Sequence, residues 1–263
     1  MFYDKIKTNF HTHTIFCGHA TDLPIDFLPV IKKYHFETFG FSEHAYIDIP
    51  SFHHTIKSDE QMDKYYEEVQ RLKNATDIEI LTGLEIDYIP SFLPYYEKLN
   101  KKFDYLSLSV HFVAFEDRYS YATRFHTVEE LKLYSEYMES GMKTGLFAFV
   151  NHPDLFLTEA LNERKNDEYI IKMEEKIIND AIKYDIPLEL NIAQYERYRS
   201  LYEEGSNRSD FWYRVGKTNA KVIVNFDCHN LEHITLEIYN EVMLFSKVRN
   251  LKIITDFRSE KWM

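Results

Sequence analysis

Short apolar runs rich in β-branched and aromatic residues alternate with longer amphipathic stretches about seven times along the 263 residues of the chain. The apolar runs are typical of buried strands, and the amphipathic stretches are typical of helices that cover a sheet. Repeated alternation of the two predicts a parallel sheet with crossover helices. We expect strands at residues 7–11, 36–41, 78–86, 103–111, 146–152, 186–192, 220–227 and, last, 251–255.

Five longer stretches have the helical pattern, and we expect helices at residues 58–74, 127–143, 166–184, 209–219 and 231–248. Two of them begin with a capping box, formed by Ser58 with Gln61 and by Thr127 with Glu130. A chain of this length suits one large domain, such as an α/β barrel, or two small domains. The barrel is the expected architecture, and an open doubly wound sheet is the alternative to it. Because no G-x-G-x-x-G or P-loop motif accompanies the first strand, a nucleotide-binding open sheet is disfavoured.

Histidine and acidic residues gather at the ends of the expected strands, which is where α/β barrels place their chemistry. In chain order they are His11, His13, His19, His44, Glu85, His111, His152, Asp227 and His229. Residues two apart on a strand point to the same side, so His11 and His13 can hold one ion, and Asp227 and His229 share a face. A lone histidine is usually structural, but this ordered set of histidines and carboxylates indicates a metal site.

The composition of the chain limits the classes of partner that it can bind. The formal net charge of −12 disfavours nucleic acid, which needs a basic surface to neutralise its phosphates. Two cysteines, Cys17 and Cys228, provide no disulfide framework. The sequence has neither the apolar run of a signal peptide nor that of a membrane helix. We therefore expect a cytoplasmic protein that acts on a small molecule without a membrane, and the oligomeric state is left open.

The phrases HTHTIFCGHA, SEHA, GLEID, LSVHF, HPDL, ELN and DCH, in this order, resemble those of the polymerase-and-histidinol-phosphatase (PHP) superfamily of metal-dependent phosphoesterases. The resemblance runs over nearly the whole chain and is greatest to the histidinol-phosphatase branch. It implies one domain, residues 1–263, folded as a distorted (β/α)7 TIM-like barrel around three divalent transition-metal ions. Histidine-rich ligation favours Zn, Mn or Fe over Ca or Mg.

The resemblance also assigns the ligands by position. It implies one ion held by His11, His13, Glu85 and Asp227, a second that shares Glu85 and is bound by His111 and His152, and a third held by His19, His44 and His229. Three divalent ions against the two carboxylates would leave a charge of about +4, which favours a phosphate monoester over a neutral ester or amide. We expect attack by a hydroxide that bridges the two ions sharing Glu85, with Glu85 and Asp227 essential to catalysis.

Other roles are expected outside the ligand set. Arg197 and Arg199, after the sixth strand, match a phosphate-binding position in kind. Asp154, or else His126, is a candidate proton donor to the leaving group.

Two positions depart from the pattern of the family. Asn225–Phe226 stands where a small Gly-Ser pair is usual, and Phe226 is bulky enough to reshape the pocket. The histidinol branch tends to place an arginine soon after its H-x-D motif. In this chain no arginine follows His152-Pro153-Asp154 before Arg164.

Together these features predict a phosphoric monoester hydrolase of the histidinol-phosphatase type, which converts L-histidinol phosphate and water to L-histidinol and phosphate. The alternative is a phosphatase of sugar or nucleoside monophosphates in the same superfamily. A non-catalytic, metal-stabilised binding domain would be expected to have a degenerate ligand set. Barrels of the amidohydrolase kind usually need a lysine on a later strand, and the fourth strand here ends in His111 instead.

Overall fold

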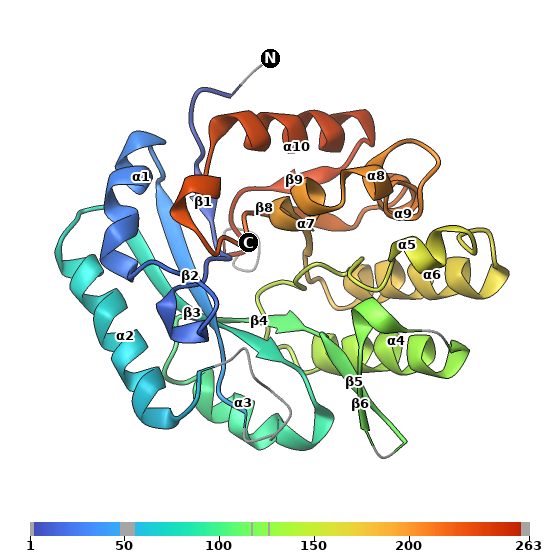
Figure 1. The fold of residues 1–263 in the computed structure, drawn as a ribbon, viewed down its shortest axis with the longest axis horizontal. Coiled ribbons are helices and arrows are strands. Elements are labelled where there is room, and N and C mark those ends of the chain that lie inside the picture. The colour runs from blue at the N-terminus through green and yellow to red at the C-terminus, as the bar shows by residue number, and fades with distance from the viewer. Residues whose placement is uncertain (1–2, 48–55, 117, 126, 259–263) are drawn as a thin grey trace.

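The computed structural model describes residues 3–47, 56–116, 118–125 and 127–258, and its parallel strands lie inside a surrounding layer of helices (Figure 1). One parallel sheet has the order β1 (Thr8–Asn9), β2 (Thr38–His44), β3 (Glu79–Asp87) and β4 (Tyr105–Ser109). A second parallel sheet has the order β7 (Leu188–Asn191), β8 (Lys221–Asn225) and β9 (Lys252–Ile254). The α/β class and the parallel strands expected from the sequence are therefore confirmed.

Residues 146–152, expected as the fifth strand, connect the two sheets. Val150 forms isolated parallel bridges to Leu108 and to Leu188. The backbone is hydrogen-bonded on both sides, because Leu108 N–H donates to Phe149 O at 2.9 Å and Glu189 N–H donates to Val150 O at 2.8 Å. This segment lies between β4 and β7, so the strands form one curled parallel sheet.

An aromatic cluster fills the inside of the curled sheet toward the amino ends of its strands. Phe10, Tyr105, Phe149 and Phe257 are buried there, and the Tyr105 hydroxyl donates to Phe10 O at 2.6 Å. A Cβ atom at Gly83 would overlap the ring of Tyr105, so glycine is required where β3 passes this ring. With this end filled by side chains, the opposite end of the sheet is the one available for a site.

The longer helices are α2 (Asp59–Asn74), α4 (Val128–Lys143), α6 (Glu168–Lys183), α9 (Asn207–Val215) and α10 (Leu236–Val248). Shorter ones are α1 (Leu28–Lys33), α3 (Leu93–Leu99), α5 (Glu159–Asn162), α7 (Ile192–Arg197) and α8 (Arg199–Tyr202), with single 3₁₀ turns at Ile15–Cys17, Pro24–Phe27, Pro90–Phe92, Ala122–Arg124 and Leu231–His233. The last expected helix, 231–248, is split into such a turn and α10, which begins after the N-cap Thr235.

The two helix starts expected from capping boxes are correct in position. At Thr127 both reciprocal bonds with Glu130 form. At Ser58 the hydroxyl accepts from Gln61 N–H, but the Gln61 side chain accepts from Lys57 N–H at 2.7 Å. The second half of the expected box is therefore displaced by one residue.

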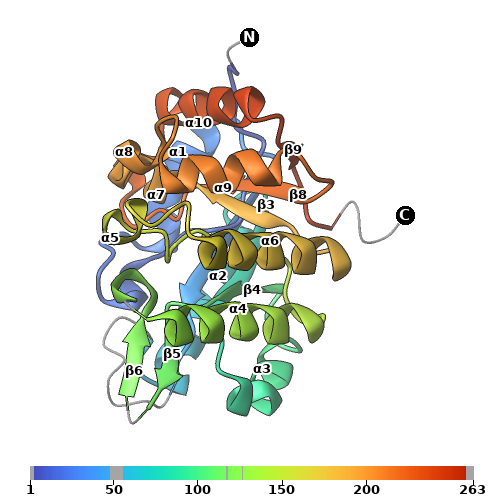
Figure 2. The same cartoon turned by 90° about the vertical axis from the view of Figure 1, so that its right-hand side faces the viewer.

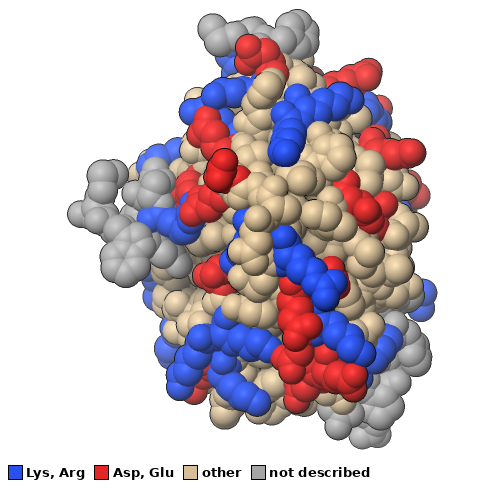
Figure 3. Space-filling view, turned by 90° about the vertical axis from the view of Figure 1, so that its left-hand side faces the viewer, with Lys and Arg blue, Asp and Glu red and all other residues tan. Residues whose placement is uncertain are grey.

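The sequence did not indicate the antiparallel hairpin of β5 (Phe112–Phe115) and β6 (Arg118–Tyr121), which follows β4 and projects beside α4 (Figure 2). On the face shown in Figure 3, basic and acidic side chains are interspersed. Within the described ranges, no helix combines the length and the hydropathy needed to cross a membrane.

Candidate metal centre

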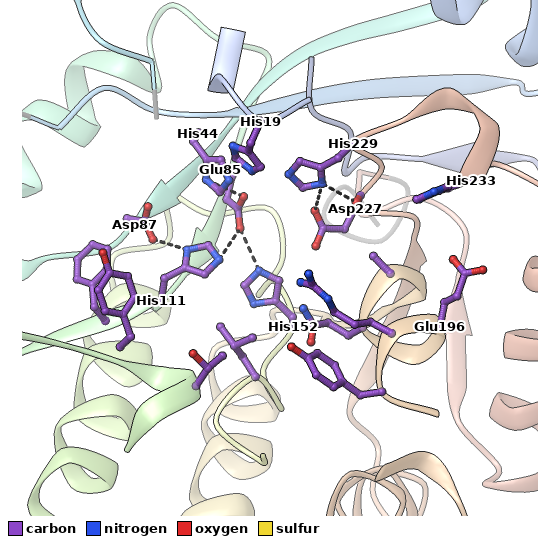
Figure 4. Close-up of a pocket in the computed structure, with 18 residues that line it drawn as sticks. His19, His44, Glu85, Asp87, His111, His152, Glu196, Asp227, His229 and His233 are labelled. Carbon is purple, nitrogen blue, oxygen red and sulfur yellow. Dashed lines mark hydrogen bonds and ion pairs between the residues drawn. The ribbon is translucent and has the colours of Figure 1, made fainter. Parts of the chain in front are cut away.

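The carboxyl ends of the parallel strands surround a cavity of about 760 Å³ (Figure 4). Seven of the nine expected ligands line it: His19, His44, Glu85, His111, His152, Asp227 and His229. The other two, His11 and His13, are fully buried behind them and face the same carboxylates. The structure thus brings together all nine residues that the sequence placed at strand ends.

Glu85, at the carboxyl end of β3, lies at the centre of the cluster. Its Oε2 atom is 3.3 Å from His11 Nε2, 3.2 Å from His13 Nε2 and 3.1 Å from His44 Nδ1. Its Oε1 atom is 3.1 Å from His152 Nε2 on the other side. One carboxylate therefore faces two separate groups of imidazoles, which is the arrangement needed to bridge two ions.

Asp227 closes the cluster from the end of β8. Its Oδ1 atom is 3.2 Å from His13 Nε2 and 3.4 Å from His11 Nε2, and its Oδ2 atom accepts from Asn191 Nδ2 at 3.1 Å. Asp227 has a φ of 51° and His152 a φ of 27°, in the left-handed region that residues other than glycine seldom adopt. Strained backbone at two expected ligands is typical of a functional site.

Residues at the outer side of the cluster form two overlapping groups of possible ligands, one of His13, His44 and His229 and one of Cys17, His19 and His229, so the expected set of His19, His44 and His229 is not gathered as a single group. The rings of His19 and His229 have centroids 4.5 Å apart, and the rings of His13 and His44 are stacked at 4.4 Å. Ligand atoms of His13, His44 and His229 lie within 4.8 Å of one another. The buried Nε2 atom of His229 has no hydrogen-bond partner, as expected of an atom arranged for a cation.

Sequence reasoning missed three buried carboxylates that lie behind the histidines. The pairs are Glu189 Oε1 with His11 Nδ1 at 2.8 Å, Glu43 Oε1 with His13 Nδ1 at 3.2 Å, and Asp87 Oδ1 with His111 Nδ1 at 2.5 Å. All three lie within the phrases ELN, SEHA and GLEID. The motifs therefore contained all three carboxylates. From the sequence, a role was expected only for His44 in SEHA and Glu85 in GLEID, and for no residue of ELN.

Burial and charge set the protonation of the centre when it holds no metal. Burial alone would raise the pKa of Glu85, but His44, His11 and His111 outweigh it and hold the pKa well below its usual range. Burial, followed by the charge of His13, lowers the pKa of His229 to about 3. Glu85 is therefore an anion and His229 a neutral imidazole, which are the forms that bind a metal ion.

The wall of the cavity away from these ligands is aromatic and polar. It is lined by Phe112, Tyr121, Thr123, Leu155, Ala193, Gln194, Glu196, Arg197, Tyr198 and His233. Arg197 is the one lysine or arginine in this lining among the described residues. Arg197 thus lies at the cavity, and its expected contact with phosphate stays a prediction.

Arg199 is a correction to the sequence prediction. Its guanidinium forms an ion pair with Glu241 at 2.7 Å, its side chain is 53% exposed, and it is absent from the lining of the cavity. The reason is geometric, because α7 ends at Arg197 and α8 begins at Arg199, and Tyr198 between them has a non-helical backbone that redirects the chain.

Asp154 is a second correction, because it lies outside the cavity lining. It is fully buried and accepts from the Tyr202 hydroxyl at 2.8 Å and from Trp212 Nε1 at 3.1 Å. Phe226 likewise does not narrow the pocket, since it is buried and its ring stacks on Tyr239 with centroids 6.3 Å apart. His126, the other candidate donor, lies outside the described residues.

Comparisons with known proteins identify a family and similar folds. Residues 9–193 match the family model of the PHP domain. A curated protein of Deinococcus radiodurans named "Probable histidinol-phosphatase" is 27% identical over 157 residues, which cover 55% of this chain and 59% of that protein. The match thus spans somewhat more than half the length of the curated relative.

Two solved structures share the fold. A histidinol phosphate phosphatase of Lactococcus lactis in complex with zinc, L-histidinol and phosphate has a TM-score of 0.72 and 16% identity, and the match covers 94% of this chain and 95% of that one. A structure from Listeria monocytogenes has a TM-score of 0.71 and 18% identity, with 87% of this chain and 97% of that chain covered.

Proposed function

This chain belongs to the PHP domain family, and from that membership we propose that it is a metal-dependent phosphatase of small phosphate monoesters, with L-histidinol phosphate as its foremost substrate. The observation that carries the proposal is the position of Glu85, whose two oxygens face separate groups of histidines. The curated relative and the zinc-bound, histidinol-bound structure support the choice of substrate. We also propose one domain over residues 1–263, in which β1 to β4, the segment at Val150, β7 and β8 form a distorted seven-stranded barrel and β9 extends the sheet beside β8.

We assign three divalent transition-metal ions, Zn, Mn or Fe, to the nine residues named from the sequence. The donor set fits, since it combines buried imidazoles with two bridging-capable carboxylates and leaves buried ring nitrogens of His44 and His229 without hydrogen-bond partners. When bound, such ions lower the pKa of coordinated water to around 7 and polarise phosphoryl oxygens. Glu85 and Asp227 supply the charge that holds the ions together.

The other residues of the chain orient these groups. Glu189, Glu43 and Asp87 only accept hydrogen bonds when ionised, so each fixes a proton on the Nδ1 atom of its histidine and turns Nε2 toward the centre. Arg197 is placed to donate to phosphate oxygens as the reacting group is aligned.

The three additional carboxylates revise the charge of the centre. Five carboxylates against three divalent ions leave about +1, in place of the +4 that follows from Glu85 and Asp227 alone. Arg197 and Glu196 both line the cavity and cancel in this count, so the centre keeps a charge of about +1, which favours an anionic phosphate ester over a neutral ester or amide.

The lining of the cavity bears on the identity of the substrate. Glu196 and the rings of Tyr121 and Tyr198 would suit a leaving group that carries an amine and a planar ring, as L-histidinol does. A sugar or nucleoside monophosphate is the second candidate, favoured by the exposure of Glu196 and Arg197 at the rim. A purely structural metal domain is the third, and the complete ligand set argues against it.

The test is a phosphatase screen on protein purified without chelator, with metal content measured on the same sample. The panel contains histidinol phosphate, sugar phosphates, nucleoside monophosphates and a phosphodiester. We expect about three metals per chain and a strong preference for histidinol phosphate. Broad monoester activity would support the second candidate, and an absence of both metal and hydrolysis would refute the phosphatase.

A further inference from the structure

The β1 and β8 strands lie next to each other and are joined by side-chain as well as backbone hydrogen bonds. We call this junction the seam. Beyond the carboxyl ends of these strands, Thr12 and Cys228 form an isolated parallel β-bridge, and His13 N–H donates to Cys228 O at 2.8 Å. Below this bridge the two strands form no regular ladder within the described residues. The peptide N–H groups there are satisfied by two fully buried asparagines.

The two asparagines act reciprocally across the seam. Phe10 N–H donates to Asn225 Oδ1 at 2.8 Å, and Phe226 N–H donates to Asn9 Oδ1 at 2.9 Å. A carboxamide offers an acceptor and donors like those of a peptide group, so each side chain replaces a missing rung of the ladder. We call this pair of bonds the asparagine clamp.

Asn225 also connects the clamp to the metal centre. Its Nδ2 atom donates to Glu189 Oε1 at 3.0 Å, and the same oxygen lies 2.8 Å from His11 Nδ1. One amide therefore contacts both the strand that carries His11 and the carboxylate that orients its ring. The glycine of the usual Gly-Ser pair, which stands opposite Asn225, has no side chain for either contact, and a serine would offer one oxygen on a shorter side chain in place of an acceptor and a donor on two separate atoms.

We propose that Asn225 is a positioning residue, which through the asparagine clamp and Glu189 sets the place and orientation of His11 in the metal centre. The inference rests on the proposed metal centre but not on any particular substrate. It explains why this chain tolerates Asn225 where a small residue is usual. Asn9 has the reciprocal role on the partner strand, because it holds the backbone of β8 next to Asp227.

The first test compares Asn225→Ser with Asn207→Ser, a matched control. Asn207 is equally buried, but its side chain donates to Thr158 O at 2.9 Å and accepts from Arg208 N–H at 2.8 Å, and neither residue lines the cavity. We expect Asn225→Ser to weaken zinc binding about 10- to 100-fold in a chelator competition. Amide exchange at Phe10 should also be faster by about tenfold or more. The control should change neither quantity.

A second variant separates the hydrogen bond from Phe10 to Asn225 from the contact between Glu189 and His11. Glu189→Gln leaves both bonds of the clamp in place, so exchange at Phe10 should stay slow, while the ¹⁵N signals of His11 should report loss of the single Nδ1–H tautomer. This variant keeps the test valid if Asn225→Ser does not fold. Asn225→Ser with wild-type zinc affinity and wild-type His11 signals would overturn the proposal, even with lowered stability.

Failure of the proposed function can be distinguished from failure of this inference. If the wild-type protein bound no zinc, the metal centre would be refuted. The positioning role of Asn225 could still be tested in the metal-free protein, by hydrogen exchange of the Phe10 amide and by the ¹⁵N signals of His11. Unchanged values of both in Asn225→Ser would refute the positioning role independently.

Discussion

The Nε2 atoms of His11 and His13 lie 3.1 Å apart, and both lie within 3.3 Å of Glu85 Oε2. Two imidazoles can present nitrogens this close only with a proton or another cation between them. The arrangement follows from the H-T-H pattern, since residues two apart at a strand end point to one side. It makes the centre of the cluster a position for cations, and the predictions below start from it.

Glu85→Gln should remove most of the turnover. The amide keeps the size of the side chain but loses the charge that faces both groups of histidines. We expect kcat to fall by about 10²- to 10³-fold or more, measured with metal content on the same sample. Glu174→Gln is the control, as Glu174 is equally buried but remote from the cavity. Wild-type turnover in Glu85→Gln with metals bound would refute the bridging role.

Arg197 and Arg199 provide a matched pair for phosphate binding. Arg197 lines the cavity and Arg199 pairs with Glu241 outside it. Loss of a charge-assisted hydrogen bond in Arg197→Met should lower kcat/KM about 10- to 100-fold. Arg199→Met should stay within about twofold of wild type, because an exposed ion pair contributes little. Equal losses in the two variants would show that the assignment of Arg197 is wrong.

Asp154→Asn should affect stability and leave the chemistry nearly unchanged. The carboxylate accepts from Tyr202 and Trp212 in a buried network beneath the cavity. We expect the free energy of unfolding to fall by roughly 1–3 kcal/mol in urea denaturation. The pH dependence of kcat should remain that of wild type. A lost limb of the pH profile would restore Asp154 as the proton donor.

Glu174 should make the protein less stable as pH rises. Burial raises the pKa of this carboxyl to about 8, despite Arg214 at 2.8 Å. A glutamate in the unfolded chain titrates near about 4.3, so between these values the folded state binds the extra proton and loses stability with rising pH. Glu174→Gln should flatten this decline in unfolding free energy, measured between about pH 5 and pH 8. An equally steep decline in the variant would contradict the assignment.

Metal binding should release protons. Burial would lower the pKa of His111, but Asp87 and Glu85 outweigh it and raise the pKa to about 9 in the metal-free protein. At pH near 7.5 an incoming ion must displace that proton, so affinity should weaken as pH falls. Calorimetry in two buffers of different ionisation enthalpy should show at least about one proton released per chain. Binding enthalpies independent of the buffer would argue against this.

The residues at the strand ends could be predicted from the sequence, because a parallel α/β fold brings the carboxyl ends of its strands together however the helices pack. His44, Glu85 and Asp227 each follow a run with clear strand character, and each lies at the mouth. The fifth expected strand was correctly placed between its neighbours, although only Val150 forms bridges.

The remaining features depend on register and on helix phase, which a single sequence does not fix. Glu189 meets His11 and Asn225 across distances of 178 and 36 residues, so its role emerged only from the pairing of strands. Arg199 faces away because the helix ends between it and Arg197. The hairpin of β5 and β6 was missed because its two strands of four residues are too short to show a period.

Because of the left-handed backbone at Asp227, the residue that would make the fold most stable differs from the residue that can bind a metal. Any L-residue with a side chain is strained at a φ of 51°, by roughly 1–2 kcal/mol, and glycine is not. Selection for heat resistance alone would therefore favour glycine at this position, and a sequence that carries it would gain ease of folding as it lost a ligand.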